Sequence, residues 1–538
     1  MPKHDWNKYF PYSSVRPEQK NAIDSILDSF ESGKRFFILN AATGVGKSAI
    51  AVTVARYIEN HFERGEEVQP GSNILTTQKL LQEQYKRDYS EINSLKSSSN
   101  YQCQFHKKET CCSSRKMLQV ADRSSAFWKA CAFNCTYAKE KKKFIEENHG
   151  VTNFSYFLTE TRYSKKLPKK SLLVIDEAHN APDVLSKFIE VTFSDKFAKA
   201  FVGLDLPEVI TPVAFVKWIK DVYYPKLDEK TQAFEAGLQK FANVKDRIES
   251  GELAKLSNQL EILSGHVQKV LTFIALYDKE NWIISEIPAE DRSGRKVEFK
   301  PIDIAPYANE YLFRMSDYVL LMSATIVDCD RFAELCGIND AKSRGTLSIN
   351  SPFPVENRPI IYSGIGKMTM NEIDSTLPKL AEAVKAILRE HKNEKGVIHA
   401  HSYKIVDYLR RNVKDSRLLF HNSENRDEVL RQHISSTKPT VLLSPSMTEG
   451  VDLKDDLSRF QILCKVPYPY LGDKLNRKKM SKWPWWLDIM TATTVIQSTG
   501  RSVRNEKDTA VTYILDSSWQ DFFKKNRHYF GPEFQSTI

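Results

Sequence analysis

A glycine-containing stretch near the start of the chain, AATGVGKS at residues 41–48, has the composition of a phosphate-binding loop. It follows an apolar run at residues 36–40 and precedes an amphipathic pattern that begins at Lys47, which is the strand–loop–helix context that such a loop requires. Glycines let backbone N–H groups turn toward a phosphate, and the helix N-terminus adds a partial positive charge. We expect Lys47 to reach the β- and γ-phosphates of ATP and Ser48 to bind Mg²⁺. The predicted nucleotide-binding residues are Thr43, Gly44, Gly46, Lys47 and Ser48.

The acidic string DEAH at residues 176–179 follows a second apolar run, residues 172–175. Ligands of an open parallel sheet bind beyond the carboxyl ends of its strands. We expect Asp176 to hold Mg²⁺, Glu177 to polarise the attacking water, and His179 to sense the γ-phosphate. Taken alone, the acids could mark a helix N-terminus. After a phosphate-binding loop and an apolar strand, the catalytic interpretation is favoured.

Two arginines and a glutamine far downstream could complete this site. Gln497, Arg501 and Arg504 are spaced by four and three residues, which predicts one face of a helix. They could be a solvated face, or arginine fingers that stabilise charge on the transferring phosphoryl group. The strand pattern TAVTYILD at residues 509–516 follows, so a second α/β domain carries them. A phosphate-binding loop on one domain and arginines on another indicate a motor, because hydrolysis would open and close the cleft between the two domains.

Five of the eight cysteines lie within residues 101–135. The surrounding residues, 99–149, are rich in Lys, Ser and Glu, and so polar an insertion buries too little apolar area to offset its chain entropy. A cross-link is the simplest way to order it, and a reducing compartment disfavours a disulfide and leaves a metal. Thiolates suit Zn²⁺ and a [4Fe–4S] cluster equally, although the two Cys-x-x-Cys pairs of many zinc sites are absent from the sequence. Unligated thiols are the remaining alternative.

The composition of the 538 residues is that of an ordinary globular protein, 41% hydrophobic and 27% charged. No stretch approaches the length of a membrane span, and the sequence begins without a recognisable signal peptide. A cytoplasmic or nuclear location is therefore expected. The net charge of +10 leans toward polyanionic partners without proving one.

Further patterns predict the elements that hold these residues. Residues 441–444 read as a strand, and in the loop after it Gly450 permits close backbone approach while Asp452 can reach the ribose or the arginines; a buried turn with an Asp cap is the alternative. Apolar residues recur at helical spacing from Leu253 to Ile274, with an earlier helical pattern from Phe234 to Ile248. We expect these two segments to pack as a helical hairpin.

Together these motifs resemble the XPD/DinG-like group of superfamily 2 helicases over most of the chain. The stretch VRPEQKNAI resembles the adenine-side motif and makes Gln19 a candidate adenine reader. NILTTQKLLQEQY resembles the first strand-contacting motif, with Thr76, Thr77 and Gln82 as candidate contacts to the backbone of a nucleic-acid strand. LMSATI, SPFPVENRPI, GVIHAHSYKI, LLSPSMTEGVDL, KVPYPYLGD and GRSVR follow in the order usual for the group.

The resemblance implies an α/β fold of two RecA-like helicase domains, with an iron–sulfur insertion and a mainly helical, arch-like insertion in the first. Helicases of this group carry an iron–sulfur domain at this place in the chain, which favours a [4Fe–4S] cluster over zinc. Cys103, Cys131 and Cys135 are its candidate ligands, and Cys112 is preferred slightly over Cys111 as the fourth. The expected boundaries are 1–98, 150–186 and 305–350 for the first helicase domain, 99–149 and 187–304 for its insertions, and 351–538 for the second domain.

The implied activity is that of an ATP-dependent DNA helicase that moves 5′→3′ on single-stranded DNA, with ATP, Mg²⁺ and the cluster as cofactors. The cluster domain is expected to act as a wedge that parts the strands, and RNA remains possible as a substrate. The chain is expected to work as a monomer without a membrane. Two alternatives stay open: a translocase or remodeller that does not unwind duplexes, and a cluster-based redox sensor or scaffold without turnover.

Overall fold

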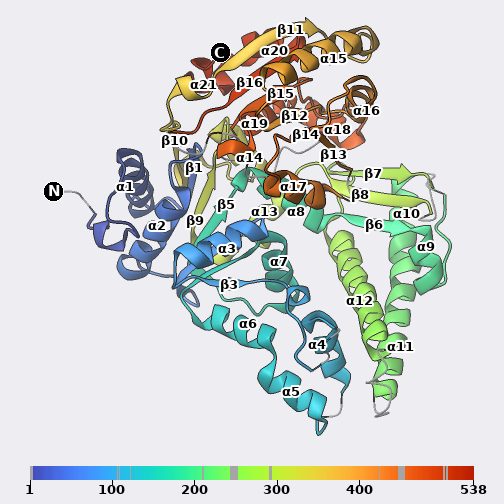
Figure 1. Ribbon diagram of the computed structural model, residues 1–538. Helices are drawn as coiled ribbons and strands as arrows, with labels where there is room; N and C mark the ends of the chain where they lie inside the picture. Colours follow the sequence, from blue (N-terminus) through green and yellow to red (C-terminus); the bar gives the residue numbers. More distant parts are fainter. Residues whose placement is uncertain are drawn as a thin grey trace.

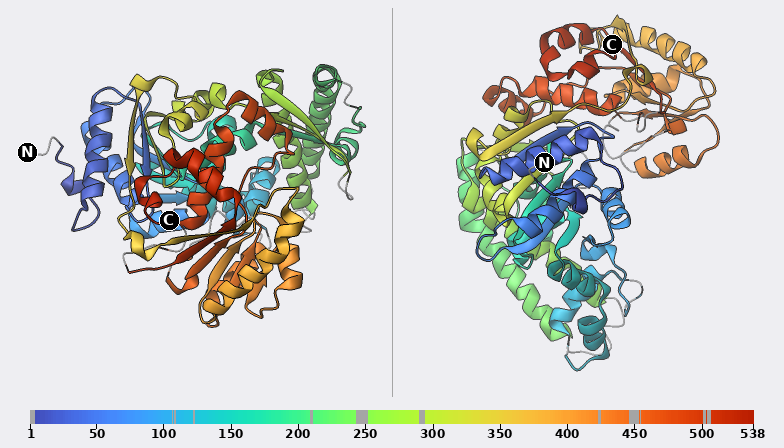
Figure 2. Two further views of the ribbon diagram at one scale, coloured as in Figure 1. Left: turned by 90° about the horizontal axis from the view of Figure 1, so that it is seen from above. Right: turned by 90° about the vertical axis from the view of Figure 1, so that its left-hand side faces the viewer.

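The computed structural model describes residues 4–105, 107, 109–121, 123–208, 211–242, 252–289, 294–422, 425–445, 453, 455–500, 503 and 507–538. Two parallel sheets dominate it, one above the other in Figure 1, and the insertions of the first sheet extend below and to the side. The right-hand view of Figure 2 shows the same separation, with the second sheet and its helices above the first sheet.

The first sheet has seven parallel strands in the order β10-β1-β9-β5-β2-β4-β3. Its strands are β1 (Phe36–Ala41), β2 (Gln69–Thr76), β3 (Asn93–Leu95), β4 (His149–Asn153), β5 (Lys170–Asp176), β9 (Ser316–Ser323) and β10 (Arg344–Ile349). Successive side chains of β1 enter opposite cores: Phe37 and Leu39 pack with the first two helices, whereas Phe36 and Ile38 pack with the helices of the other face. Burial on both faces explains the continuous apolar runs of β1 and β5.

Helices cover both faces of this sheet. On one face lie α1 (Pro17–Glu31), α2 (Lys47–His61) and α3 (Lys79–Asp88). The other face is covered in part by α7 (Phe154–Thr159), α8 (Ala181–Ile189), α13 (Ala305–Tyr311) and α14 (Cys329–Leu335). Because β1, β9 and β5 are parallel neighbours, their carboxyl ends meet at one edge of the sheet, where Ala41, Ser323 and Asp176 stand together.

The second sheet has six parallel strands in the order β11-β16-β15-β12-β14-β13. They are β11 (Ile360–Gly366), β12 (Gly396–His399), β13 (Leu418–Phe420), β14 (Val441–Ser444), β15 (Phe460–Leu463) and β16 (Val511–Asp516). Their helices are α15 (Ile373–Glu390), α16 (Tyr403–Asn412), α17 (Arg426–Ser435), α18 (Lys474–Lys482), α19 (Trp486–Thr499), α20 (Ser518–Asn526) and α21 (Pro532–Gln535). Two parallel sheets flanked by helices confirm the expected fold class of two RecA-like domains.

The cysteine-rich insertion between β3 and β4 consists of three short helices, α4 (Cys111–Val120), α5 (Ala126–Asn134) and α6 (Thr136–Glu146). It lies below the first sheet in Figure 1. Its apolar residues, Phe127, Tyr137 and Phe144 among them, join the core on one face of the first sheet. The insertion is therefore docked on the domain and not tethered at a distance.

A second insertion, between β5 and β9, is mainly helical. Its long helices α11 (Tyr224–Ala242) and α12 (Glu252–Leu276) pack side by side, as the sequence pattern predicts, and stand at the right of Figure 1. Short helices α9 (Asp195–Phe197) and α10 (Pro212–Trp218) join them to the antiparallel strands β6 (Val191–Ser194), β8 (Lys296–Pro301) and β7 (Trp282–Ile287). Leu260, Leu263 and Val270 of α12 are buried, which assigns the apolar stripe to packing.

One predicted element differs from the structure. Helix α19 ends at Thr499 with Gly500 as its C-cap, which the spacing of Gln497, Arg501 and Arg504 does not predict; both arginines lie outside the described residues, so their place beside Gln497 stays a prediction. A glycine at this position ends a helix readily because it carries no side chain to hold the helical conformation. Within the described part of the chain, no helix combines the length and apolar character needed to cross a membrane.

Candidate ATP site and cysteine centre

The phosphate-binding loop connects β1 to α2 with two glycines in the left-handed region. Gly44 has φ +91° and Gly46 has φ +89°, values that L side chains rarely adopt. Helix α2 begins directly after Gly46, so its first N–H groups face the end of the loop. The Lys47 ammonium donates to the Ala41 carbonyl at 3.0 Å, which folds the side chain across the loop. Thr43 and Ser48 lie in and beside the same turn, as predicted.

The start of α1, with Arg16 before it, supports the loop from outside. The Gln19 side-chain amide donates to the Val45 carbonyl at 3.0 Å and accepts from the Arg16 backbone N–H at 3.1 Å. The Arg16 guanidinium donates to the Gly44 carbonyl at 2.6 Å. Gln19 is therefore in contact with the nucleotide loop, and its role in reading adenine stays a prediction. Arg16 was not predicted, because a single arginine before a helix has no distinctive pattern.

Asp176 is buried at the carboxyl end of β5, and both of its carboxylate oxygens are held. The Glu177 N–H donates to Oδ1 at 3.0 Å, and the Tyr85 hydroxyl from α3 donates to Oδ2 at 3.0 Å. Burial, followed by the nearby Glu177, raises the pKa of Asp176 to about 6, while Lys47 and Tyr85 oppose the shift. Burial also raises the pKa of Tyr85, so its hydroxyl keeps its proton. A hydroxyl on Ser48 and a carboxylate on Asp176 are the oxygen donors that Mg²⁺ prefers, so these residues fit the ion.

Glu177 follows with φ +54°, which is uncommon for a residue with a side chain and marks a constrained turn. His179 lies two residues further, in the short helix Ala178–Asn180. Its Nδ1 is 3.4 Å from the Glu177 carboxylate and 2.7 Å from the Ser323 hydroxyl at the end of β9. The imidazole thus joins the two neighbouring strand ends, β5 and β9.

The second domain reaches the same imidazole. Gln497 near the end of α19 donates from Nε2 to His179 Nε2 at 2.8 Å and lies 3.4 Å from the Thr325 hydroxyl. Since His179 Nε2 accepts this bond, Nδ1 carries the proton and donates to Ser323. We call these four residues, His179, Ser323, Thr325 and Gln497, the relay. Its contacts run from the Glu177 carboxylate of the first domain into a helix of the second.

A second contact between the domains lies over the phosphate loop. A Cβ built on Gly44 would overlap the Phe353 ring, with three ring carbons between 2.1 and 2.8 Å away. Phe353 belongs to the segment that connects the two sheets, and its buried ring packs with Val503 and Ala510 of the second domain. Val503 stands between the two predicted arginines in the sequence. Gly44 is therefore required for its conformation and for this close approach.

Arg501, Arg504, Gly450 and Asp452 lie outside the described residues. Their closest described neighbours in the sequence include Leu453 and Val503, both of which are buried. The roles expected for these four residues stay predictions.

Four thiols of the cysteine-rich insertion come together. Cys103, Cys111, Cys131 and Cys135 are all buried, and the Sγ atoms of Cys135 and Cys111 are 3.9 Å apart. A hydrogen bond from Cys131 lowers the pKa of Cys135 to about 5, and the same bond, with burial, raises the pKa of Cys131. Burial, with the nearby Cys135 and Cys103, raises the pKa of Cys111 to about 11. Four adjacent sulfur donors from separate parts of the insertion fit a thiolate-bound metal or iron–sulfur group.

Cys112 is not part of this cluster. Its thiol points to the Glu261 carboxylate of α12 at 3.2 Å, so it contacts the helical insertion instead. Consecutive residues of a helix point about 100° apart, and α4 begins at Cys111, so only one of the pair faces the other thiols. The preference for Cys112 over Cys111 as fourth ligand is corrected by this geometry. None of the eight cysteines, all within the described chain, forms a disulfide, and Cys336 and Cys464 are buried.

Two family models match the chain. A model described as helicase C-terminal domain matches residues 386–531, and one described as type III restriction enzyme, res subunit, matches residues 12–205. The ATP-dependent DNA helicase YoaA of Escherichia coli K12 is 21% identical over 436 residues, which cover 71% of this chain and 66% of that protein. The ATP-dependent DNA helicase DinG of Photobacterium profundum is 21% identical over 472 residues, with 71% and 67% covered.

The chain thus spans about two thirds of the length of these two relatives. A solved XPD helicase superposes with a TM-score of 0.64 at 16% identity, covering 96% of this chain and 98% of the other. The two family models and these relatives make the chain similar to the XPD/DinG-like group of superfamily 2 helicases, and the solved XPD structure shows that it shares their fold.

The predicted strand contacts of this XPD/DinG-like protein lie where β2 turns into α3. Thr76 is buried and its hydroxyl donates to the Gln78 carbonyl at 3.1 Å, whereas Thr77 is partly exposed and its carbonyl accepts from Asn153 at 3.3 Å. The Gln82 side chain is fully buried, and within the described chain its amide atoms have no hydrogen-bond partner. Burial of Thr76 and Gln82 leaves Thr77 as the partly exposed member of the set, and the contacts of all three residues with a nucleic-acid strand stay predictions.

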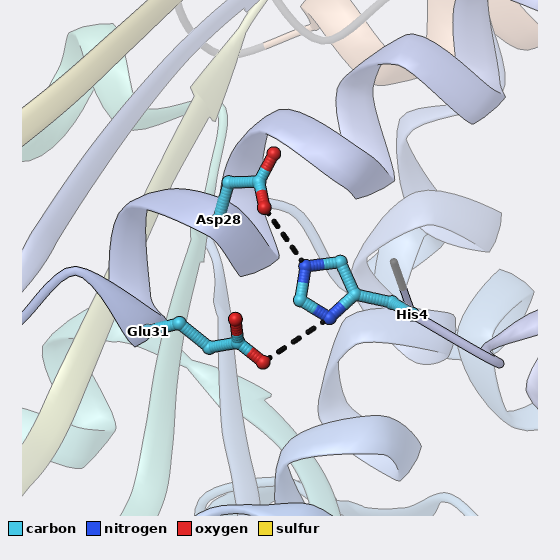
Figure 3. Close-up of side chains that lie close together, drawn as sticks. All are labelled: His4, Asp28 and Glu31. Carbon is cyan, nitrogen blue, oxygen red and sulfur yellow. Dashed lines mark hydrogen bonds and ion pairs between the residues drawn. The ribbon is translucent and has the colours of Figure 1, made fainter. Parts of the chain in front are cut away.

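A histidine–carboxylate cluster outside the site holds the first described residues against α1. Figure 3 shows His4 between Asp28 and Glu31, with Nε2 3.0 Å from Asp28 and Nδ1 3.3 Å from Glu31. The ring is buried and its two nitrogens face different carboxylates. A cation would need both carboxylates on the same side of the ring, so we assign this cluster to packing.

Proposed function

We propose that this protein is an ATP-driven DNA helicase that moves 5′→3′ along single-stranded DNA and unwinds duplexes. The Gln497–His179 bond carries the proposal, because it connects the predicted hydrolytic carboxylates of one domain to a helix of the other. A change at the γ-phosphate that moves His179 must then also move α19. The relatives YoaA and DinG, both called ATP-dependent DNA helicases, support DNA as the substrate.

In this proposal the loop N–H groups and Lys47 bind the phosphates of ATP. Ser48 and Asp176 hold Mg²⁺, which neutralises phosphate charge and orients the phosphates when bound. Glu177 orients the attacking water, and the His179 imidazole lies beside this carboxylate, with Nδ1 3.4 Å from its oxygen. Arg501 and Arg504 enter from the second domain to stabilise charge on the transferring group, with Gly450 and Asp452 on the same side.

In this proposal the protein moves along the strand because its two domains alternate between a closed state, in which two contacts join them, and an open state. The relay and the Phe353 contact hold the domains together on the nucleotide side. Hydrolysis removes the group that the relay senses, and the two sheets separate. Repeated closing and opening moves a strand that is bound across both domains, with Thr77 of the first domain among the contacts.

The four clustered thiols, Cys103, Cys111, Cys131 and Cys135, hold a [4Fe–4S] cluster in this proposal. The cluster supplies the cross-link that a small polar insertion needs for a fixed shape, and no electron transfer is required of it. The insertion meets the helical insertion through the contact of Cys112 with Glu261. A rigid body at this place acts as the wedge that parts the strands.

The test compares duplexes that carry a 5′ overhang, a 3′ overhang or blunt ends, each with an RNA counterpart. We expect ATP-dependent unwinding of the DNA with the 5′ overhang and its loss in Lys47→Ala. Unwinding from the 3′ overhang alone would contradict the direction. DNA-stimulated phosphate release without any unwinding would favour a translocase, and binding without phosphate release would favour a non-enzymatic scaffold.

A further inference from the structure

The Tyr85 hydroxyl connects α3 to the predicted magnesium site. Its ring is buried in the core between α3 and the first sheet, and its hydroxyl donates to Asp176 Oδ2 at 3.0 Å. The Ser48 hydroxyl lies close enough to lower the pKa of this phenol, although burial raises it overall. Both predicted oxygen donors to Mg²⁺ therefore have Tyr85 as a neighbour.

This phenol limits how the Asp176 carboxylate can turn. Oδ1 is fixed by the Glu177 N–H, which belongs to the same strand end. Oδ2 is fixed from a different element, since Tyr85 belongs to α3. Rotation of the carboxylate would break one of these bonds, and a hydrogen bond to a charged group is among the stronger ones in proteins. The orientation of Asp176 thus depends on the position of α3.

Helix α3 begins directly after the segment predicted to contact single-stranded DNA. Thr76 ends β2, Thr77 and Gln78 form the turn, and Lys79 is the first helical residue. Tyr85 lies six residues further along, about 9 Å of rigid helix. A strand that binds at the turn shifts or fixes the helix, and with it the hydroxyl on Asp176.

We propose that Tyr85 is a positioning residue that orients the Asp176 carboxylate and carries the effect of strand binding from the Thr77 turn to the magnesium site. This proposal rests on the proposed function for the identity of the bound strand. The contact between Tyr85 and Asp176 is independent of that function. Thr77, where the strand binds, and Asp176, whose orientation changes, lie on adjacent elements, since β2 pairs with β5.

The experiment measures the affinity of ADP by calorimetry, once with Mg²⁺ and once with EDTA. The ratio is the dissociation constant in EDTA divided by the dissociation constant with Mg²⁺. Tyr85→Phe keeps the buried ring and removes the hydroxyl alone. We expect the ratio to fall about tenfold while the affinity in EDTA is unchanged, because only the magnesium-dependent part of binding uses Asp176. Tyr89→Phe is the matched control, since Tyr89 is also buried beside α3 but its hydroxyl faces Tyr12 at 3.4 Å.

The second part repeats the measurement with single-stranded DNA. In the natural protein we expect DNA to raise the ratio, and in Tyr85→Phe we expect no such rise. An unchanged ratio in Tyr85→Phe without DNA would overturn the positioning role. A rise with DNA that persists in the variant would overturn the link to the Thr77 turn. Neither measurement requires turnover, so a wild-type protein that fails to unwind DNA would reject the proposed function and leave this test valid.

Discussion

The ATP site and the cysteine centre bring distant residues together by opposite means. At the ATP site, Lys47, Asp176 and Ser323 stand beside the ends of buried parallel strands, and the packing of the first sheet fixes them. In the cysteine insertion, three short helices surround four thiols. The first site is organised by its scaffold, whereas the second, in the function proposed above, is held by the group that its four thiols bind.

From this difference we expect nucleotide to change how the two domains move, and the group bound by the thiols to determine whether the insertion is folded. Removing nucleotide contacts should leave the first sheet intact, because its strands are buried on both faces. Removing a thiol should disturb the insertion itself, because metal binding and folding are coupled in small domains of this kind. The predictions below separate these two behaviours.

The largest effect is expected for Lys47→Ala. Without the ammonium the phosphates lose their main cation from the loop, and we expect DNA-stimulated phosphate release to fall by at least about a hundredfold. The melting temperature should stay within a few degrees of the natural protein, as measured by circular dichroism. A large loss of stability would show that the site is not organised by its scaffold alone.

The pair Cys111→Ser and Cys112→Ser tests the other half of the comparison. We expect Cys111→Ser to lose more than about half of its iron and visible absorbance and the insertion to become protease-sensitive, since one of four sulfur donors is gone. Cys112→Ser serves as the control and should keep its iron and its visible absorbance, because the Cys112 thiol faces Glu261.

Iron and colour are measured on protein purified without oxygen. Loss of iron in Cys112→Ser alone would contradict the assignment of ligands, and a colourless protein that contains zinc would reject the cluster while leaving the ATP site unaffected.

A smaller effect is expected for Gln497→Ala, which removes the bond from the second domain to His179. Loss of a single buried hydrogen bond corresponds to about a tenfold decrease in DNA-stimulated turnover. The KM for ATP should change little, because Gln497 contacts the relay and not the phosphate loop. Gln432→Ala, on the exposed surface of α17, is the control. Equal loss in both variants would exclude a specific role of the relay.

The smallest effect is expected for Phe353→Ala. The ring packs on Gly44 from one side and on Val503 from the other, so its removal loosens the contact between the loop and the second domain. We expect about a threefold lower stimulation of turnover by DNA, with Phe353→Leu close to the natural protein because it keeps most of the apolar volume. An effect of Phe353→Leu as large as that of Phe353→Ala would contradict a packing role.

The sequence predicts the strand ends well and the side-chain directions poorly. Strands β1, β5 and β14 were predicted because strands buried on both faces are continuous apolar runs. Cys111 and Cys112 could not be separated, since adjacent residues differ only in the direction that the start of α4 gives them. The end of α19 at Thr499 was not predicted, since a glycine within a helical spacing does not by itself mark the end of a helix.

Tyr85 shows a further limit. An aromatic residue at core spacing on a helix normally packs, and its ring does so here, while the hydroxyl reaches a carboxylate 91 positions away. The same burial that hides the Tyr85 ring also places the Gln82 side chain inside. Contacts of this kind depend on how α3 sits on the sheet, which local sequence does not specify.

The central claim is that His179 and Gln497 act as one unit across the two domains. A double-mutant cycle on DNA-stimulated ATP turnover, with His179→Ala, Gln497→Ala and the double variant, tests it most directly. Because the bond between them is absent in either single variant, we predict that the double variant is little slower than His179→Ala. Independent effects that multiply in the double variant would contradict the claim.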